Sequence, residues 1–188
     1  MKKSYIIGAV ILLVVIGGFF VVYEYEYSPK AKYQKGLSYY KDKNYQKALP
    51  LFEEAAKQGY APAEEKLGYM YLNGWGIPQD YNKAVYWFKK SAHQGNAIGE
   101  AGLGGMYMLG KGGLSKDYQK ALYWTKKAAK QGNAAGENNL GYMYAKGLGV
   151  PQDYNKALYW FKKAAEQGYA PAKANLEYLE LAHLFGGY

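Results

Sequence analysis

The sequence contains neither cysteine nor arginine, and each absence weighs against a class of function. Without cysteine, the chain can form no disulfide and no thiolate metal site. Because arginine is missing, all 24 basic residues are lysines, and the residue best suited to bidentate base and phosphate contacts is not available. The lysines are interleaved with glutamates, so the net charge of +9 indicates a solvated surface and argues against specific nucleic-acid binding.

One long uncharged run lies near the N-terminus. Tyr5 to Tyr23 would span roughly 28 Å as a helix, close to the ~30 Å hydrocarbon core of a bilayer. The residues at its end, FFVVYEYEY, contain no small-residue cleavage site, and their tyrosines suit a membrane interface. We therefore expect residues 1–28 to be an uncleaved single-pass membrane anchor. The two lysines before the run favour a cytoplasmic N-terminus, with residues 29–188 outside the cytoplasm.

A motif recurs along the rest of the chain. DYNKAVYWFKKSAHQG begins at Asp80, DYQKALYWTKKAAKQG at Asp117 and DYNKALYWFKKAAEQG at Asp153. A fainter copy, NYQKALPLFEEAAKQG, begins at Asn44, and the steps between the four copies are 36, 37 and 36 residues. A period of this length is typical of a solenoid of stacked repeats.

Each period contains two helical patterns. The recurrent motif is the second helix, with an aspartate or asparagine at its N-cap, an apolar face and a Gln-Gly pair at its end. Its paired lysines complement the negative end of the helix dipole. The first helix carries LGYMY or LGGMY, with a glycine at 68, 104 or 141. A glycine inside a helix costs ~1 kcal/mol relative to alanine, so we expect another helix to cross close to it.

These motifs resemble a known repeat family. L-G-x-x-Y, followed by G-x-G-[IV]-P-Q-D-Y-x-K-A-x-x-W-x-x-K-A-A-x-Q-G, is similar to the SEL-one-like repeat, a relative of the tetratricopeptide repeat with a longer inter-helix loop. The resemblance covers residues 30 to about 182 and implies an all-α, right-handed solenoid whose first helices line the concave side. Repeats are expected at about 30–59, 60–95, 96–132 and 133–168, with a capping helix at 169–184. The first unit lacks the longer loop and fits the tetratricopeptide spacing instead.

The resemblance also implies which residues line the concave groove. In tetratricopeptide-like helices they are the residue after the mid-helix glycine and the positions three before and four or five after it. Carried over, the candidate groove residues are Tyr33, Leu37, Tyr40, Lys41, Glu65, Tyr69, Leu72, Asn73, Ala101, Gly105, Met108, Asn138, Tyr142, Ala145 and Tyr178. Tyrosine and methionine are favoured at protein interfaces. The alternative is that these tyrosines only pack between neighbouring helices.

Patterns that could support catalysis are incomplete. Ser38 and Lys41 have the S-x-x-K spacing of penicillin-interacting serine enzymes, but the chain lacks S-D-N and K-T-G. Residues 105–112 have phosphate-loop spacing but lack the following serine or threonine, and a helix precedes them where a strand is required. His93 and His183 fall far apart along a solenoid. We therefore expect no enzyme activity, no metal and no cofactor.

The sequence thus predicts a non-enzymatic protein-interaction module. One hypothesis is a membrane-anchored scaffold or adaptor of the bacterial inner membrane, whose periplasmic repeats bind a protein partner in the concave groove. A second, implied by the resemblance, is a periplasmic immunity protein that neutralises a secreted lipase-type effector. A β-lactamase-like enzyme is a more remote alternative. The groove residues define a surface and do not identify its partner.

Overall fold

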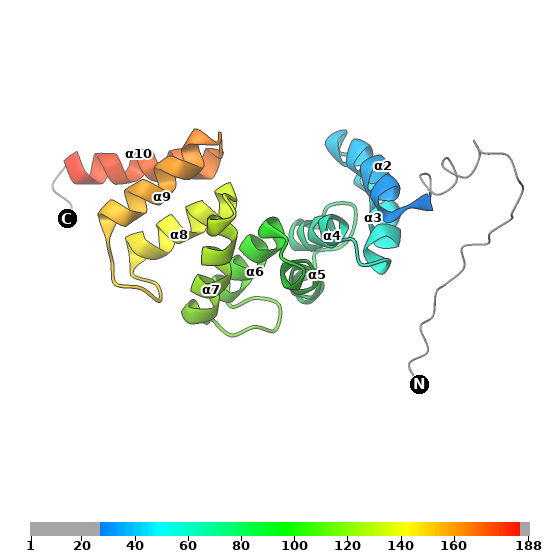
Figure 1. The fold of residues 1–188 in the computed structure, drawn as a ribbon, viewed down its shortest axis with the longest axis horizontal. Coiled ribbons are helices and arrows are strands. Elements are labelled where there is room, and N and C mark those ends of the chain that lie inside the picture. Colours follow the sequence, from blue (N-terminus) through cyan, green and yellow to red (C-terminus); the bar gives the residue numbers. More distant parts are fainter. Residues whose placement is uncertain (1–26, 185–188) are drawn as a thin grey trace, which may run out of the picture.

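The computed structural model describes residues 27–184, with side chains up to residue 181, and this part of the chain is entirely α-helical (Figure 1). The helices are α2 (Pro29–Lys41), α3 (Tyr45–Lys57), α4 (Ala61–Asn73), α5 (Tyr81–His93), α6 (Ala97–Leu109), α7 (Tyr118–Lys130), α8 (Ala134–Lys146), α9 (Tyr154–Glu166) and α10 (Ala170–Leu184). None of these helices is long and apolar enough to cross a membrane. The predicted span, Tyr5 to Tyr23, lies outside the described residues.

The helices form four antiparallel hairpins, α2–α3, α4–α5, α6–α7 and α8–α9, followed by the capping helix α10. Helices α3, α5 and α7 also pack against the first helix of the next hairpin, and α9 packs against α10. The first helices additionally contact one another, α4 with α6, α6 with α8 and α8 with α10, whereas no two second helices make a comparable contact. The first helices therefore lie on the inner side of the curved array, and their exposed surface is called the concave groove below.

Helix ends follow the sequence signals. The carboxylates of Asp80, Asp117 and Asp153 accept hydrogen bonds from the backbone N–H groups three residues later, at 3.0, 2.9 and 2.9 Å. The glycines of the Gln-Gly pairs have φ between 75° and 81°, a left-handed conformation that glycine adopts without strain. The predicted N-caps and helix stops are thus confirmed.

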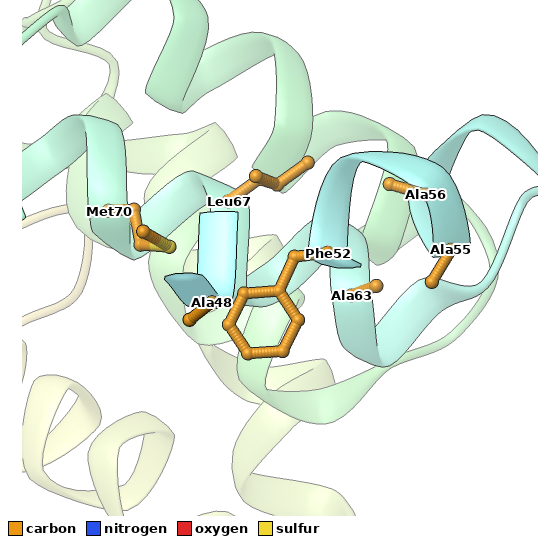
Figure 2. Close-up of a cluster of buried hydrophobic side chains, with 7 residues drawn as sticks. All are labelled: Ala48, Phe52, Ala55, Ala56, Ala63, Leu67 and Met70. Atoms are coloured by element: carbon orange, nitrogen blue, oxygen red, sulfur yellow. The ribbon is translucent and has the colours of Figure 1, made fainter. Parts of the chain in front are cut away.

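The mid-helix glycines allow the two helices of a hairpin to pack closely. A Cβ atom at Gly36, Gly68 or Gly141 would lie 2.6 to 2.8 Å from the ring of a fully or almost fully buried phenylalanine. These rings belong to Phe52, Phe88 and Phe161, respectively. Figure 2 shows the first of them among the alanine side chains, Leu67 and Met70 of its cluster. The expected close crossing is therefore present in these three hairpins.

The third hairpin achieves its close crossing differently. Thr125 occupies the position at which the other second helices carry phenylalanine, and it is completely buried. A Cβ atom at Gly104 would lie 2.6 Å from its hydroxyl oxygen and 3.2 Å from its backbone nitrogen. Helices α6 and α7 therefore approach until the backbone of one nearly touches that of the other.

The loops inside the hairpins fix neighbouring repeats to each other. Gly76 and Gly149 both have φ of +70°, and a Cβ atom at either would lie 2.7 Å from Tyr45 or Tyr118, at the start of the preceding second helix. The Gln119 side-chain amide donates a hydrogen bond to the Gly149 carbonyl at 3.1 Å. The loop between α2 and α3 is short, as the sequence predicts, and spans only residues 42–44.

Candidate protein-binding groove

The predicted groove tyrosines near the N-terminus pack partly against the core. The rings of Tyr33 and Tyr40 lie 5.7 and 5.9 Å from that of Phe52, and the ring of Tyr69 lies 5.0 Å from that of Phe88. Burial, followed by the nearby Glu65 carboxylate, raises the pKa of Tyr33 to about 12. In this half of the groove the tyrosines contribute to packing between helices, as the alternative interpretation predicts.

Glu65 lies among these tyrosines and is 2% exposed. Its carboxylate pairs with the ammonium of Lys66 at 3.0 Å, and that ammonium also lies 5.4 Å from the centre of the Tyr40 ring. Burial raises the pKa of Glu65, and the charge of Lys66 opposes the shift. The carboxylate is therefore an internal group of the groove wall and is not presented at its surface.

The remaining predicted positions differ in exposure. Leu37, Leu72 and Met108 are partly buried. The amide of Asn73 is exposed and donates to the Tyr69 carbonyl at 2.9 Å. Asn138 is 9% exposed, and its side-chain oxygen accepts a hydrogen bond from the Asn175 amide at 2.9 Å. This last contact connects α8 to α10.

The accessible aromatic surface of the groove lies at its C-terminal end. Tyr142 is 41% exposed and Tyr178 is 61% exposed. Both line a small pocket, whose lining residues are Tyr142, Ala145, Lys146, Phe161, Asn175, Tyr178 and Leu179. At the position of Ala145 the other first helices carry Tyr40, Leu72 and Met108, so the small side chain leaves room between α8 and α10. The pocket combines apolar walls with one amide and one ammonium group.

Tyr69, on α4, lies beside the buried Glu65 carboxylate. Burial raises the pKa of Tyr69, and the charge of Glu65 adds to the shift.

Sequence reasoning missed a set of buried ion pairs. Glu64, Glu100 and Glu137 on the first helices are completely buried. Each carboxylate forms an ion pair with the second lysine of the Lys-Lys pair on the following helix, and it accepts a hydrogen bond from the glutamine of the Gln-Gly pair at the end of that helix. The partners are Lys90 and Gln94 for Glu64, Lys127 and Gln131 for Glu100, and Lys163 and Gln167 for Glu137. The signal was present as a glutamate four residues before each of the three mid-helix glycines. These lysines are therefore bound to carboxylates, in addition to any effect on the helix dipole.

The first hairpin carries the same ion pair with the charges exchanged. Lys32, four residues before its mid-helix glycine, pairs with Glu54 on the second helix. Glu54 is 36 residues before Lys90 and occupies the equivalent place in the motif. An ion pair therefore joins the first and second helices in all four hairpins, and its charges are reversed in the first hairpin.

The outer side carries a regular set of exposed tyrosines. Tyr86, Tyr123 and Tyr159 on the second helices are 54%, 57% and 58% exposed. Each lies edge-on to the ring of the tryptophan that follows it, at 4.9 to 5.0 Å between ring centres. They are useful controls, since they match the groove tyrosines in type and exposure but lie on the second helices.

The family model of the Sel1 repeat matches residues 23–60, 61–96, 97–133 and 134–169. The chain belongs to the Sel1 repeat family. The match includes the first hairpin, which the sequence placed nearer to the tetratricopeptide spacing, so its short loop is a variation within a Sel1 repeat. Proteins of this family generally act as non-enzymatic protein-interaction modules.

Three solved structures of bacterial proteins are similar to the chain. A protective antigen of uropathogenic Escherichia coli with an SLR fold is 38% identical, with a TM-score of 0.69, over 85% of this chain and 35% of that one. A Sel1 repeat protein from Oxalobacter formigenes is 34% identical, with a TM-score of 0.71, over 79% of this chain and 60% of that one. Cysteine rich protein B of Helicobacter pylori is 25% identical, with a TM-score of 0.52, over 66% of this chain and 94% of that one.

The chain spans about a third and three fifths of the length of the first two of these structures. No curated protein matches it.

Proposed function

We propose that the Sel1 repeats hold a protein partner in the concave groove, as a scaffold or adaptor. The observation that carries this proposal is the pair of exposed tyrosines, Tyr142 on α8 and Tyr178 on α10, beside a pocket. Tyrosine supplies a large contact area with few rotatable bonds, and binding hot spots are rich in it. Family membership supports an interaction function in general, and the geometry supports this surface in particular.

We further propose that residues 1–28 anchor the chain in the bacterial inner membrane, with the repeats in the periplasm. The support is the length and lack of charge of the run from Tyr5 to Tyr23, together with the bacterial origin of the similar structures. Fractionation of cells that produce the full chain tests this proposal. Recovery of the intact chain in the soluble fraction would contradict it.

The double variant Tyr142→Ala, Tyr178→Ala is expected to lose the partner in a pull-down from a detergent extract, while its helicity and melting temperature stay close to those of the wild type. Truncation of interface tyrosines commonly costs ~1–4 kcal/mol each, which is enough to dissociate a micromolar complex. These two residues are preferred to Tyr69, because the Tyr69 ring packs on Phe88 and its removal would also disturb the core.

The matched control is Tyr123→Ala, Tyr159→Ala, which removes two exposed tyrosine rings from the outer helices. This control should retain the partner. If the control loses the partner and the groove variant keeps it, the binding surface lies on the second helices and the proposal is wrong.

A further inference from the structure

The second helices α5 and α7 each carry a row of aromatic and basic side chains on the outer side of the array. Tyr86 and Tyr123 are 54% and 57% exposed. A lysine follows three residues after each tyrosine, and a histidine or a further lysine follows seven residues after it, which places these side chains on one side of the helix. Together they are called the outer row below, and its members are Tyr86, Lys89, His93, Tyr123, Lys126 and Lys130.

The lysines of the outer row have no counter-charge of their own. Lys126 and Lys130 are exposed, and Lys89 is partly exposed. The adjacent lysines, Lys90 and Lys127, pair with buried glutamates, and the lysines nearest the helix starts pair with the aspartate caps. Within residues 27–181, by contrast, the three lysines of the outer row form no ion pair. Neither α5 nor α7 contains an acidic residue, so the row is cationic.

The equivalent positions on the flanking second helices limit this cationic surface to α5 and α7. On α3, a proline replaces the tyrosine, and Glu53 and Glu54 replace the lysine pair. On α9, the last position of the row is Glu166. Successive hairpins are also turned relative to one another (Figure 1). A flat surface can therefore meet adjacent second helices but not the whole outer side.

The residue types of the outer row favour a lipid surface over a protein. Tyrosine and tryptophan are enriched where a membrane meets water, and lysine extends its charge toward lipid phosphates. Lysine is depleted at protein interfaces. On α5 and α7, Tyr86 and Tyr123 are the exposed large hydrophobic side chains. The row can therefore adsorb to lipid headgroups, but it lacks the aliphatic surface needed to enter the hydrocarbon core.

The chain before α2 keeps a membrane within reach of the array. Residues 24–28 connect the uncharged run, which ends at Tyr23, to α2, which begins at Pro29. A segment of this length spans at most ~18 Å, and a short tether raises the effective concentration of a contact, so that a weak contact is sufficient. We infer that the outer row docks on the anionic phospholipid headgroups of the membrane that anchors the chain. The inference rests on the proposed anchor.

Spin labels test this inference, because the chain contains no cysteine and a single introduced cysteine can be labelled uniquely. The full chain, with a nitroxide at position 86, 123 or 142, is reconstituted in vesicles of phosphatidylcholine alone or with about a third of phosphatidylglycerol. The anionic lipid is expected to lower the accessibility of positions 86 and 123 to a water-soluble nickel chelate by at least about threefold, and to leave position 142 in the groove unchanged. Salt at about 0.5 M should restore the accessibility.

Charge reversal identifies the residues responsible. The triple variant Lys89→Glu, Lys126→Glu, Lys130→Glu should lose the protection of position 123 in the anionic vesicles. The matched control, Lys41→Glu, Lys146→Glu, Lys173→Glu, changes the net charge equally through exposed lysines elsewhere and should keep the protection. Circular dichroism shows whether each variant is folded.

The possible outcomes separate the docking surface from the anchor. Equal accessibility of positions 86 and 123 in the two kinds of vesicle would overturn the inference and leave the anchor in place, and so would equal loss of protection in the two triple variants. If the outer-row variant does not fold, protection that persists at high salt overturns the inference instead. Protection that appears only after a cell extract is added would assign the outer row to a protein partner and also overturn it. A chain that fails to float with the vesicles would contradict both the anchor and the inference.

Discussion

Gly104→Ala is expected to destabilise the third hairpin by about 2 kcal/mol or more, whereas Gly105→Ala, one residue later, is expected to stabilise it by up to about 1 kcal/mol. The new Cβ atom at position 104 would lie 2.6 Å from the Thr125 hydroxyl, 3.2 Å from its backbone nitrogen and 3.3 Å from the Ala121 carbonyl oxygen. Two of these atoms are backbone, so the clash is relieved only if α6 and α7 separate. At position 105 the nearest atom is 3.9 Å away, and only the better helix propensity of alanine remains.

Urea unfolding of the two variants, with hydrogen exchange over α6 and α7, measures this difference. Because each repeat contacts only its neighbours, the loss of protection in Gly104→Ala should be largest in the third hairpin. Equal effects at the two positions would show that α6 does not approach α7 closely at Gly104.

Lys127→Met is expected to destabilise the fold by about 2 kcal/mol, whereas Lys126→Met should change the free energy of unfolding by less than about 0.5 kcal/mol. The Lys127 ammonium lies 2.8 Å from the Glu100 carboxylate, which is completely buried, and this hydrogen bond raises the pKa of Lys127. Removing the lysine leaves a buried charge with only Gln131 as its partner. We expect a loss of stability below the range typical of fully buried ion pairs, because the Lys127 side chain is 41% exposed.

A double-mutant cycle separates the ion pair from packing. The double variant Lys127→Met, Glu100→Met should recover much of the stability lost in Lys127→Met, because no charge then remains buried without a partner. Lys126→Met is the matched control, since it removes the neighbouring lysine of the same helix. If the two lysine variants were equally stable, the second lysine of each pair would act only as a solvated charge.

Features that depend on a short stretch of chain could be predicted from the sequence. The aspartate caps, the glycine helix stops and the period of the hairpins all follow from residues within one helix and its ends, so Asp117 and Gly132 could be assigned without a structure. The crossing at the mid-helix glycines could be predicted in outline. At that crossing in the third hairpin, Thr125 stands where the other hairpins have phenylalanine. The resulting close approach of α6 and α7 becomes visible only in the structure, where the positions of both helices are known.

Features that join two helices could not be predicted in the same way. The pattern within one helix does not distinguish Lys126 from Lys127, because the buried carboxylate that binds the second of them belongs to the preceding helix. Repeat position also does not determine exposure. Tyr69 and Tyr142 are equivalent in the motif, but Tyr69 is partly buried and packs on Phe88, whereas Tyr142 lies beside the last helix and is open to solvent.

Site-specific photo-crosslinking shows whether a partner binds on the concave side. A photoreactive benzoylphenylalanine placed at position 142 or at position 123 replaces a tyrosine that is already exposed, so neither substitution should disturb the core. Irradiation of intact cells that produce the full chain is expected to give a discrete protein adduct from position 142 and none from position 123. An adduct from position 123 with none from position 142 would place the partner on the second helices, and the concave groove would not be the binding surface.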